Sequence, residues 1–114
     1  MEDRTRYRLN DIVDAIDQIG SLLHAKSYND LVSDKVIKAA FERFLEILSE
    51  ASRHIPDDMK AGRPDIPWRR ISDIGNHLRH AYDRVDNEIL WEVYASGELA
   101  LLRDSTIEFL KQSK

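Results

Sequence analysis

The stretch Val36–Ala51, VIKAAFERFLEILSEA, decides which fold class this chain adopts. Its apolar residues return every three or four positions, which is the period of an α-helix rather than of a β-strand. The apolar arc is broad, so we expect this helix to be central. Asp30 and Ser33 are its candidate N-caps, because short polar side chains accept hydrogen bonds from the free N–H groups of a first turn. The arc comprises Val36, Ile37, Ala40, Phe41, Phe44, Leu45, Ile47, Leu48 and Ala51.

Three other segments have helical signals. Leu9–Leu23 repeats the apolar spacing and predicts one buried stripe. Pro67–Tyr82 opens on a proline, whose missing N–H suits the first turn of a helix. Asp86–Leu110 can be capped by Asp86 and contains Gly97 as a candidate kink. With no convincing alternation of period two, the sequence predicts an all-α, antiparallel bundle of four to five helices.

The connection between the predicted helices Val36–Ala51 and Pro67–Tyr82 holds all three prolines of the chain, between Pro56 and Pro67. Proline breaks the helical pattern, so we expect a loop there, with one short turn at Pro56–Met59. A chain of 114 residues suits one domain better than two, since domains centre near ~100–150 residues. We therefore expect residues 1–114 to form a single helical domain.

Composition bounds the function. The chain has no cysteine, which excludes disulfides and thiolate metal sites. No apolar run approaches the ~20 residues that span a bilayer, so we expect a cytoplasmic protein without a membrane segment. The formal charge is −4, yet residues 53–84 carry seven Lys and Arg against five acids and include three of the four histidines. A phosphate-handling site is therefore expected in that segment.

Within it, Gly75–Tyr82 is the candidate for chemistry, because the chain lacks a Gly-rich phosphate loop, a His-Glu-x-x-His motif and a nucleophile-elbow serine. On a helix, Asn76 and His80 lie one turn apart on one face. Asp73 and Arg69 lie beside them, and His77 and Arg79 flank them. The sequence thus gathers an amide, imidazoles and guanidinium groups around one spot.

Such a set can cleave a phosphodiester without a metal. A histidine with a pKa near neutral can move a proton, a guanidinium can hold the phosphate, and a ribose 2′-hydroxyl can be the nucleophile. By spacing alone, a solvated polar helix face is the simpler interpretation. A metal site at His54, His77 and His80 is weakly supported without cysteine or a carboxylate array. The aromatic residues are assigned mainly to packing; they are Trp68, Tyr82, Trp91 and Tyr94.

A family resemblance favours the catalytic interpretation of this helix face over a merely solvated one. Ile66-Pro67-Trp68-Arg69, then Asn76-x-x-x-His80-x-Tyr82 and Val85-Asp86, resembles the signature of HepT-type proteins of the HEPN superfamily. Glu50-Ala51, near the end of the second predicted helix, is also similar to that family. The likeness extends over nearly the whole chain in the order and spacing of the helices.

The resemblance implies a metal-independent endoribonuclease toxin that needs no cofactor and cuts RNA. It also implies that arginine and histidine meet across a two-fold homodimer interface. The partner it implies is a MNT-type nucleotidyltransferase antitoxin of a HepT/MntA pair. In that family the antitoxin adenylylates the motif tyrosine, which is Tyr82 here.

One position departs from the family pattern, because Gly75 stands where the family has arginine, five residues before His80. Arg79 lies one turn later, and helical side chains lean towards the N-terminus, so its guanidinium can occupy the vacated space. We therefore assign proton transfer to His80, phosphate stabilisation to Arg79 and orientation to Asn76. The substrate-binding residues are predicted to be Arg69, Arg70 and His77.

Two further expectations follow from this departure. If positions 75 and 79 share one space, Gly75→Arg should rescue Arg79→Ala. The opposing interpretation is that Gly75 marks close helix packing in a domain that has lost catalysis. The protein would then be an inactive interaction or nucleotide-binding module that partners a nucleotidyltransferase.

Overall fold

The computed structural model describes residues 1–80 and 86–112. Within these ranges the chain forms seven helices and no strand, which confirms the all-α prediction. No helix in the described part is long and apolar enough to cross a membrane. The helices are α1 Asp3–Leu23, α2 Tyr28–Ser33, α3 Lys35–Arg53, α4 Asp57–Ala61, α5 Trp68–His80, α6 Asn87–Ala95 and α7 Glu98–Gln112.

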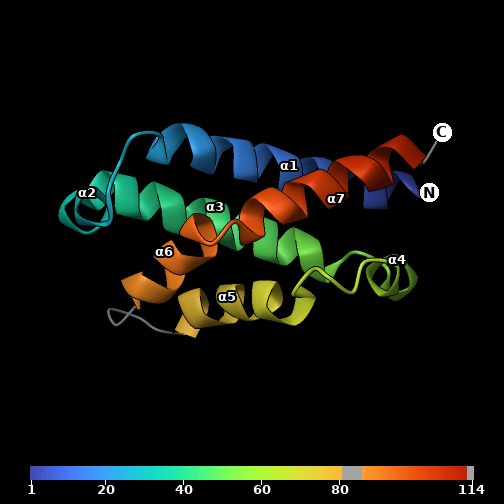
Figure 1. The fold of residues 1–114 in the computed structure, drawn as a ribbon. Coiled ribbons are helices and arrows are strands. Elements are labelled where there is room, and N and C mark those ends of the chain that lie inside the picture. Colours follow the sequence, from blue (N-terminus) through green and yellow to red (C-terminus); the bar gives the residue numbers. More distant parts are fainter. Residues whose placement is uncertain (81–85, 113–114) are drawn as a thin grey trace.

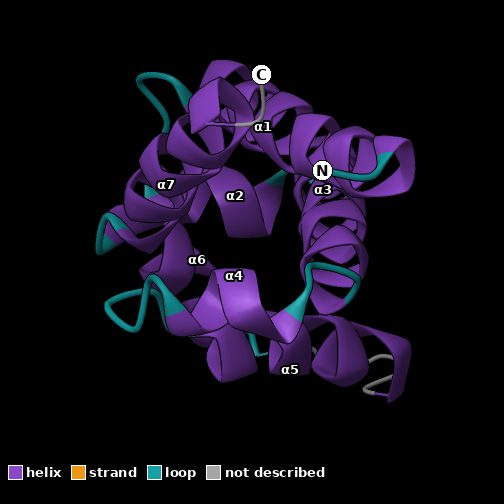
Figure 2. Cartoon of the chain, turned by 90° about the vertical axis from the view of Figure 1, so that its right-hand side faces the viewer, coloured by secondary structure: helices purple, strands orange, loops and turns teal. Residues whose placement is uncertain are grey.

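The four longest helices form an antiparallel bundle (Figures 1 and 2). Helix α3 packs against α1 on one side and against α5 on the other, while α7 packs against α1. Figure 2, viewed towards one end of the bundle, shows these helices as a ring, with α6 between α5 and α7. The central place predicted for the second helix is thereby confirmed, since α3 packs against both α1 and α5.

The core lies inside this ring and is built from the predicted apolar stripes. Helix α1 contributes aliphatic residues that recur every three or four positions, and α3 contributes Phe41, Leu45 and Leu48, which are fully buried. Burying such side chains stabilises the fold by roughly 1.5–3 kcal/mol each, so the stripes outweigh the helix propensities of single residues. The remaining long helices supply Ile71, Ile74, Leu99, Leu102 and Phe109.

The N-cap predicted for α3 is wrong. Asp30 and Ser33 both lie inside the extra helix α2, which Ser27 caps in a reciprocal capping box with Asp30. The cap of α3 is Asp34, whose carboxylate accepts hydrogen bonds from the N–H groups of Val36 and Ile37. Ser33 donates to the carbonyl of Asn29 instead. Both candidates have side chains that can cap a helix, but they lie in a six-residue helix that was too short to be predicted from the apolar spacing.

Gly97 does more than kink the last helix. Its φ of +89° lies in the left-handed region, which glycine adopts without strain, and the chain breaks there into α6 and α7. Asp86 caps α6 as predicted, accepting from the N–H groups of Glu88 and Ile89. The short turn predicted after Pro56 is present as α4.

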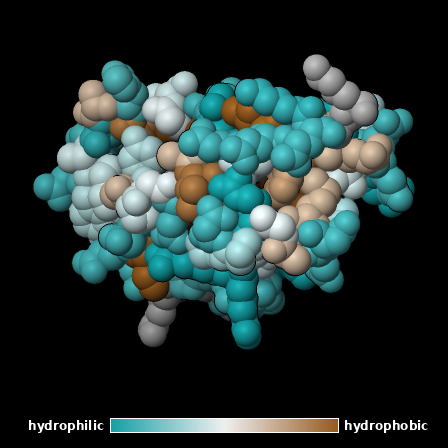
Figure 3. Space-filling model, turned by 45° about the vertical axis from the view of Figure 1, so that its right-hand side comes forward, coloured by the Kyte–Doolittle hydropathy of each residue, from teal (hydrophilic) through white to brown (hydrophobic). Residues whose placement is uncertain are grey.

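The sequence analysis assigned the aromatic residues mainly to packing, and those that the structure describes do make packing contacts. The ring of Trp68 stacks on Phe109 at 6.5 Å between centroids. Trp91 lies 5.4 Å from Tyr94 and 6.2 Å from Tyr28. Trp68, Trp91 and Tyr94 are partly buried and pack against the outside of the core. The face shown in Figure 3 is mainly hydrophilic, with hydrophobic residues in small separate patches.

Candidate functional site on helix α5

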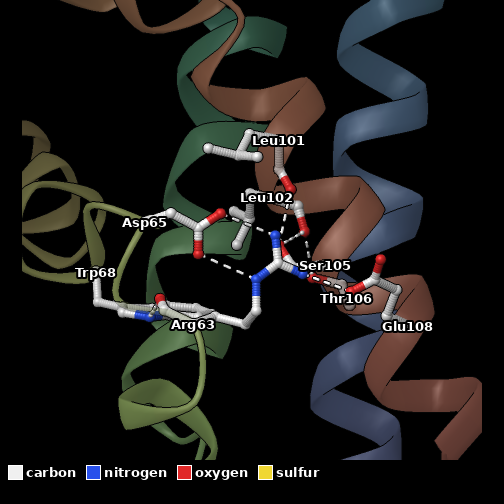
Figure 4. Close-up of polar contacts among 8 residues, drawn as sticks. All are labelled: Arg63, Asp65, Trp68, Leu101, Leu102, Ser105, Thr106 and Glu108. Atoms are coloured by element: carbon white, nitrogen blue, oxygen red, sulfur yellow. Dashed lines mark hydrogen bonds and ion pairs between the residues drawn. The ribbon is translucent and has the colours of Figure 1, made fainter.

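Helix α5 is held at its first turn by the loop that precedes it. The indole Nε1 of Trp68 donates to the carbonyl of Arg63 at 3.0 Å. The guanidinium of Arg63 lies between Asp65, in the same loop, and Glu108 of α7 (Figure 4). Hydrogen bonding to this guanidinium holds the pKa of the Asp65 carboxyl below its usual value. The start of α5 is thus fixed to α7 by polar contacts that close the loop.

The two faces of α5 divide as the sequence predicts. Ile71, Ile74 and Gly75 are buried against the bundle, and Asn76 and His80 are exposed on the opposite side. Arg69 and Asp73 are exposed on this same side. His80 makes no hydrogen bond or ion pair with any residue in the described ranges. Its imidazole is therefore accessible to a substrate or to a second protein chain.

The buried side of α5 makes an unusually close contact with α3 at Gly75. The Ser49 hydroxyl accepts a hydrogen bond from the Gly75 N–H at 3.0 Å and donates to the carbonyl of Ser72 at 3.2 Å. A Cβ atom on Gly75 would lie 2.5 Å from the Ser49 oxygen, closer than any packed side chain tolerates. Glycine is thus favoured here by the close approach of α3, as the packing interpretation of Gly75 anticipated.

Arg79 lies over the same glycine. Its Nη1 atom is 3.3 Å from the position that a Gly75 Cβ would take, so the guanidinium does lean back into the vacated space. Its Nη2 atom donates to the Asn76 side-chain oxygen. The Nη1 atom also faces the Glu50 carboxylate of α3 at 3.9 Å. The structure therefore brings Arg79 and Asn76 together and adds Glu50 from a second helix.

Glu50 is the member of this site that the sequence analysis did not assign a role. Its other carboxylate oxygen hydrogen-bonds the His54 ring at 3.0 Å. This hydrogen bond, with the nearby Arg53, His54 and Arg79 charges, lowers the pKa of Glu50. The Glu50/His54 spacing of four residues was visible in the sequence. The pairing with Arg79 was not, because it depends on how α3 and α5 pack.

The three residues predicted to bind substrate separate from one another. Arg70 points towards α7, where its Nε lies 3.3 Å from Glu98. The His77 Nε2 accepts a hydrogen bond from the Asp86 backbone N–H at 3.1 Å, which joins the end of α5 to the start of α6. An imidazole nitrogen that accepts this bond is unprotonated, so the neutral ring suits this contact. Arg69 alone stays on the Asn76 and His80 side.

Among the described residues, two hollows border the α5 face. One, of about 300 Å³, is lined by Arg79 and Glu50 and continues over α3 to α1, where it is lined by Arg8, Asp11, Arg43, Glu46 and Ile47. The other, of about 210 Å³, lies between α5 and α6 beside His77 and Arg70. Tyr82, the predicted modification site, falls outside the described residues. Within residues 1–80 and 86–112, no three His, Asp or Glu side chains are grouped to hold a metal.

Comparison with known proteins identifies the family. The family described as "Ribonuclease HepT-like" matches residues 12–108. "Probable ribonuclease HepT" of Thermococcus cleftensis is 40% identical over 84 residues, which cover 74% of this chain and 76% of that protein. A "Putative RNase" of Methanocaldococcus jannaschii is 33% identical over 75% of this chain and 78% of its own length.

A "Putative RNase" of Caldanaerobacter subterraneus is also 33% identical, over 77% of this chain and 78% of its own length. No solved structure matches the chain. The family match covers α3, α5 and α6 completely, and with them every described residue of the candidate site. The resemblance drawn from the motif residues is confirmed, and the chain belongs to the HepT-like ribonuclease family of the HEPN type.

Proposed function

We propose that this protein is a metal-independent endoribonuclease toxin whose site is composed of the α5 faces of two copies of the chain. The observation that carries the proposal is the arrangement on α5. His80, which bonds to none of the residues in 1–80 and 86–112, lies one turn from Asn76, and Asn76 holds the Arg79 guanidinium above Gly75. Membership of a ribonuclease family gives this arrangement its substrate.

The reaction follows from the groups present. His80 removes the proton of a ribose 2′-hydroxyl, whose oxygen then forms a bond to the adjacent phosphorus. The bond from phosphorus to the 5′-oxygen breaks, and that oxygen takes up a proton as it leaves. Arg79 stabilises the charge that develops on the phosphate oxygens. The products are a 2′,3′-cyclic phosphate and a 5′-hydroxyl end.

A second copy of the chain explains why one protomer looks incomplete. Acid and base are both needed, yet the described α5 face offers His80 as its one unengaged histidine, because His77 is bonded to the Asp86 N–H. Two α5 faces related by a two-fold axis would supply two histidines and two arginines to one cleft. A strictly monomeric mass at micromolar concentration would refute this part of the proposal.

We further propose that the partner is a MNT-type nucleotidyltransferase antitoxin that adenylylates Tyr82. The family resemblance supports this, together with the place of Tyr82 two residues after His80 in the sequence. A bulky anionic nucleotide so near His80 would repel the RNA backbone and silence the toxin. Co-purification of the two proteins and an ATP-dependent mass gain lost in Tyr82→Phe would test it.

The test of activity is cleavage of RNA by the purified protein in a chelator. General acid–base catalysis contributes ~10²–10⁴-fold, so His80→Ala should reduce cleavage by at least a hundredfold. His24→Ala is the matched control, because His24 is an exposed histidine at the end of α1 and is absent from the α5 face. Wild-type protein that binds its nucleotidyltransferase but cuts no RNA would instead identify an inactive interaction module.

A further inference from the structure

The proposed phosphate ligand, Arg79, depends on α3 for its position. Arginine has a long, flexible side chain that loses much rotamer freedom when it is fixed, so a catalytic guanidinium needs more than one contact. Asn76 supplies one contact from within α5. The other lies on α3, where the Oε2 atom of Glu50 faces the Arg79 Nη1 at 3.9 Å.

Glu50 is itself oriented by its neighbours. Its Oε1 atom is hydrogen-bonded to His54, the residue that caps the C-terminal end of α3, which leaves Oε2 directed at the Arg79 and Arg53 guanidinium groups. The Glu50 side chain is 48% exposed and that of Arg79 is 37% exposed, so the pair lies at the rim of the α5 face. A carboxylate in this place can hold a guanidinium and still leave its other N–H groups open to a phosphate.

The contact exists because α3 and α5 approach closely one residue away. The bridge from Ser49 to the α5 backbone brings Glu50 beside α5, and the absent side chain at Gly75 leaves room for the Arg79 Nη1. The two helices therefore position Arg79 together, because Ser49 holds α3 close to α5 and Glu50 provides the negative charge that faces the guanidinium.

We propose that Glu50 is a positioning residue that holds the Arg79 guanidinium over Gly75, in the orientation in which Asn76 also holds it. This rests on the proposed function, in which Arg79 stabilises the phosphate. Glu50 acts through Arg79 and does not touch the substrate. Its removal therefore lowers the turnover rate without weakening RNA binding.

Charge distinguishes this role from that of an ordinary surface acid. An acid beside an RNA site repels phosphates, so neutralising it should lower KM and leave kcat unchanged. A positioning acid behaves differently, because its loss lets the guanidinium leave the productive geometry and lowers kcat. An exposed ion pair of this kind accounts for at most about a fivefold effect, which is the decrease expected for Glu50→Gln.

Glu46 offers a matched control. It lines the same 300 Å³ hollow one turn earlier on α3, and it lies 3.9 Å from Arg43, the same distance that separates Glu50 from Arg79. Glu46→Gln removes the same charge from this hollow, but Glu46 pairs with Arg43 and not with Arg79. It should lower KM slightly and leave kcat at the wild-type value.

The experiment measures kcat and KM on a single-site oligoribonucleotide for the wild type, Glu50→Gln, Glu46→Gln, and Glu50→Gln combined with Arg79→Ala. We expect kcat to fall by up to about fivefold in Glu50→Gln alone, and we expect Glu50→Gln to cause no further loss in the Arg79→Ala protein. A wild-type kcat for Glu50→Gln, or an equal loss with and without Arg79, would overturn the proposal.

A measurement that needs no activity separates this proposal from the proposed function. The side-chain Nε–H signal of Arg79, assigned by its loss in Arg79→Lys, should report a rigid group in the wild type and a mobile one in Glu50→Gln. If the wild type cuts no RNA but this change occurs, the positioning role stands and the ribonuclease assignment fails. An Arg79 signal equally mobile in both proteins would refute the positioning role.

Discussion

Replacing Gly75 with alanine tests the helix contact on which the site rests. Alanine in a helix interior is favoured over glycine by about 1 kcal/mol, so the substitution would stabilise an open helix position. At Gly75 the new Cβ meets the Ser49 oxygen at 2.5 Å and the Ser49 Cβ at 3.2 Å. Overpacking of this kind costs roughly 1–3 kcal/mol, which outweighs the gain. Gly75→Ala should therefore destabilise the protein by about 1 kcal/mol.

Gly20 provides the control for this prediction. It lies within α1, is exposed, and has no atom within 4 Å of the place where a Cβ would stand. Gly20→Ala should therefore stabilise the protein by about 1 kcal/mol. At about 4 °C per kcal/mol for a chain of this size, the melting temperatures of the two variants should differ by about 8 °C.

The assay is thermal unfolding followed by circular dichroism, at one fixed protein concentration because an oligomer's melting temperature depends on it. Ser49→Ala removes the nearest atom and should cancel most of the cost of Gly75→Ala, so the two substitutions should not be additive. An equal stabilisation by Gly75→Ala and Gly20→Ala would refute the close approach of α3 to α5. The same contact means that Gly75→Arg should fail to rescue Arg79→Ala, contrary to the sequence-based expectation.

Three more predictions concern the scaffold. Asp86→Ala removes the cap of α6 and should cost about 1 kcal/mol of stability by urea unfolding, whereas Asp14→Ala, on the exposed side of α1, should change it little. Leu45→Ala opens a cavity at a fully buried position of α3 and should cost about 2–5 kcal/mol, with Val36→Ala, which is 78% exposed, as the inert comparison. Asp65→Asn tests the loop that holds α5: because Arg63 lowers the folded pKa of Asp65, the stabilisation is complete above the unfolded value of 3.8 and disappears as the pH falls through the folded pKa. The wild type and Asp65→Asn should therefore differ in melting temperature at pH 6 and converge in acid, and a difference that persists in acid would assign it to another cause.

The amino-acid sequence by itself determined the long helices α1, α3 and α5 and their buried faces, but not the short helix α2 or the break between α6 and α7. Apolar spacing is a property of each segment, so α1, α3 and α5 could be predicted without knowledge of their neighbours. The exposed side of α5, with Asn76 and His80 one turn apart, follows from the same period. The family resemblance, confirmed by the match to the HepT-like ribonuclease family, supplied the activity expected of that side.

Tertiary structure decided what happens between helices. No spacing within α5 reveals that Ser49 of α3 reaches the Gly75 N–H, or that Glu50 faces Arg79, because those distances depend on how two helices pack. The same holds for His77, whose ring is used by the α6 backbone rather than left at the surface. The sequence placed Asn76, His80 and Arg69 on one exposed side of α5. The packing of α3 against α5 decided which side chains touch across the two helices, because such contacts depend on the shapes and volumes of both packed surfaces and not on the period of one helix alone.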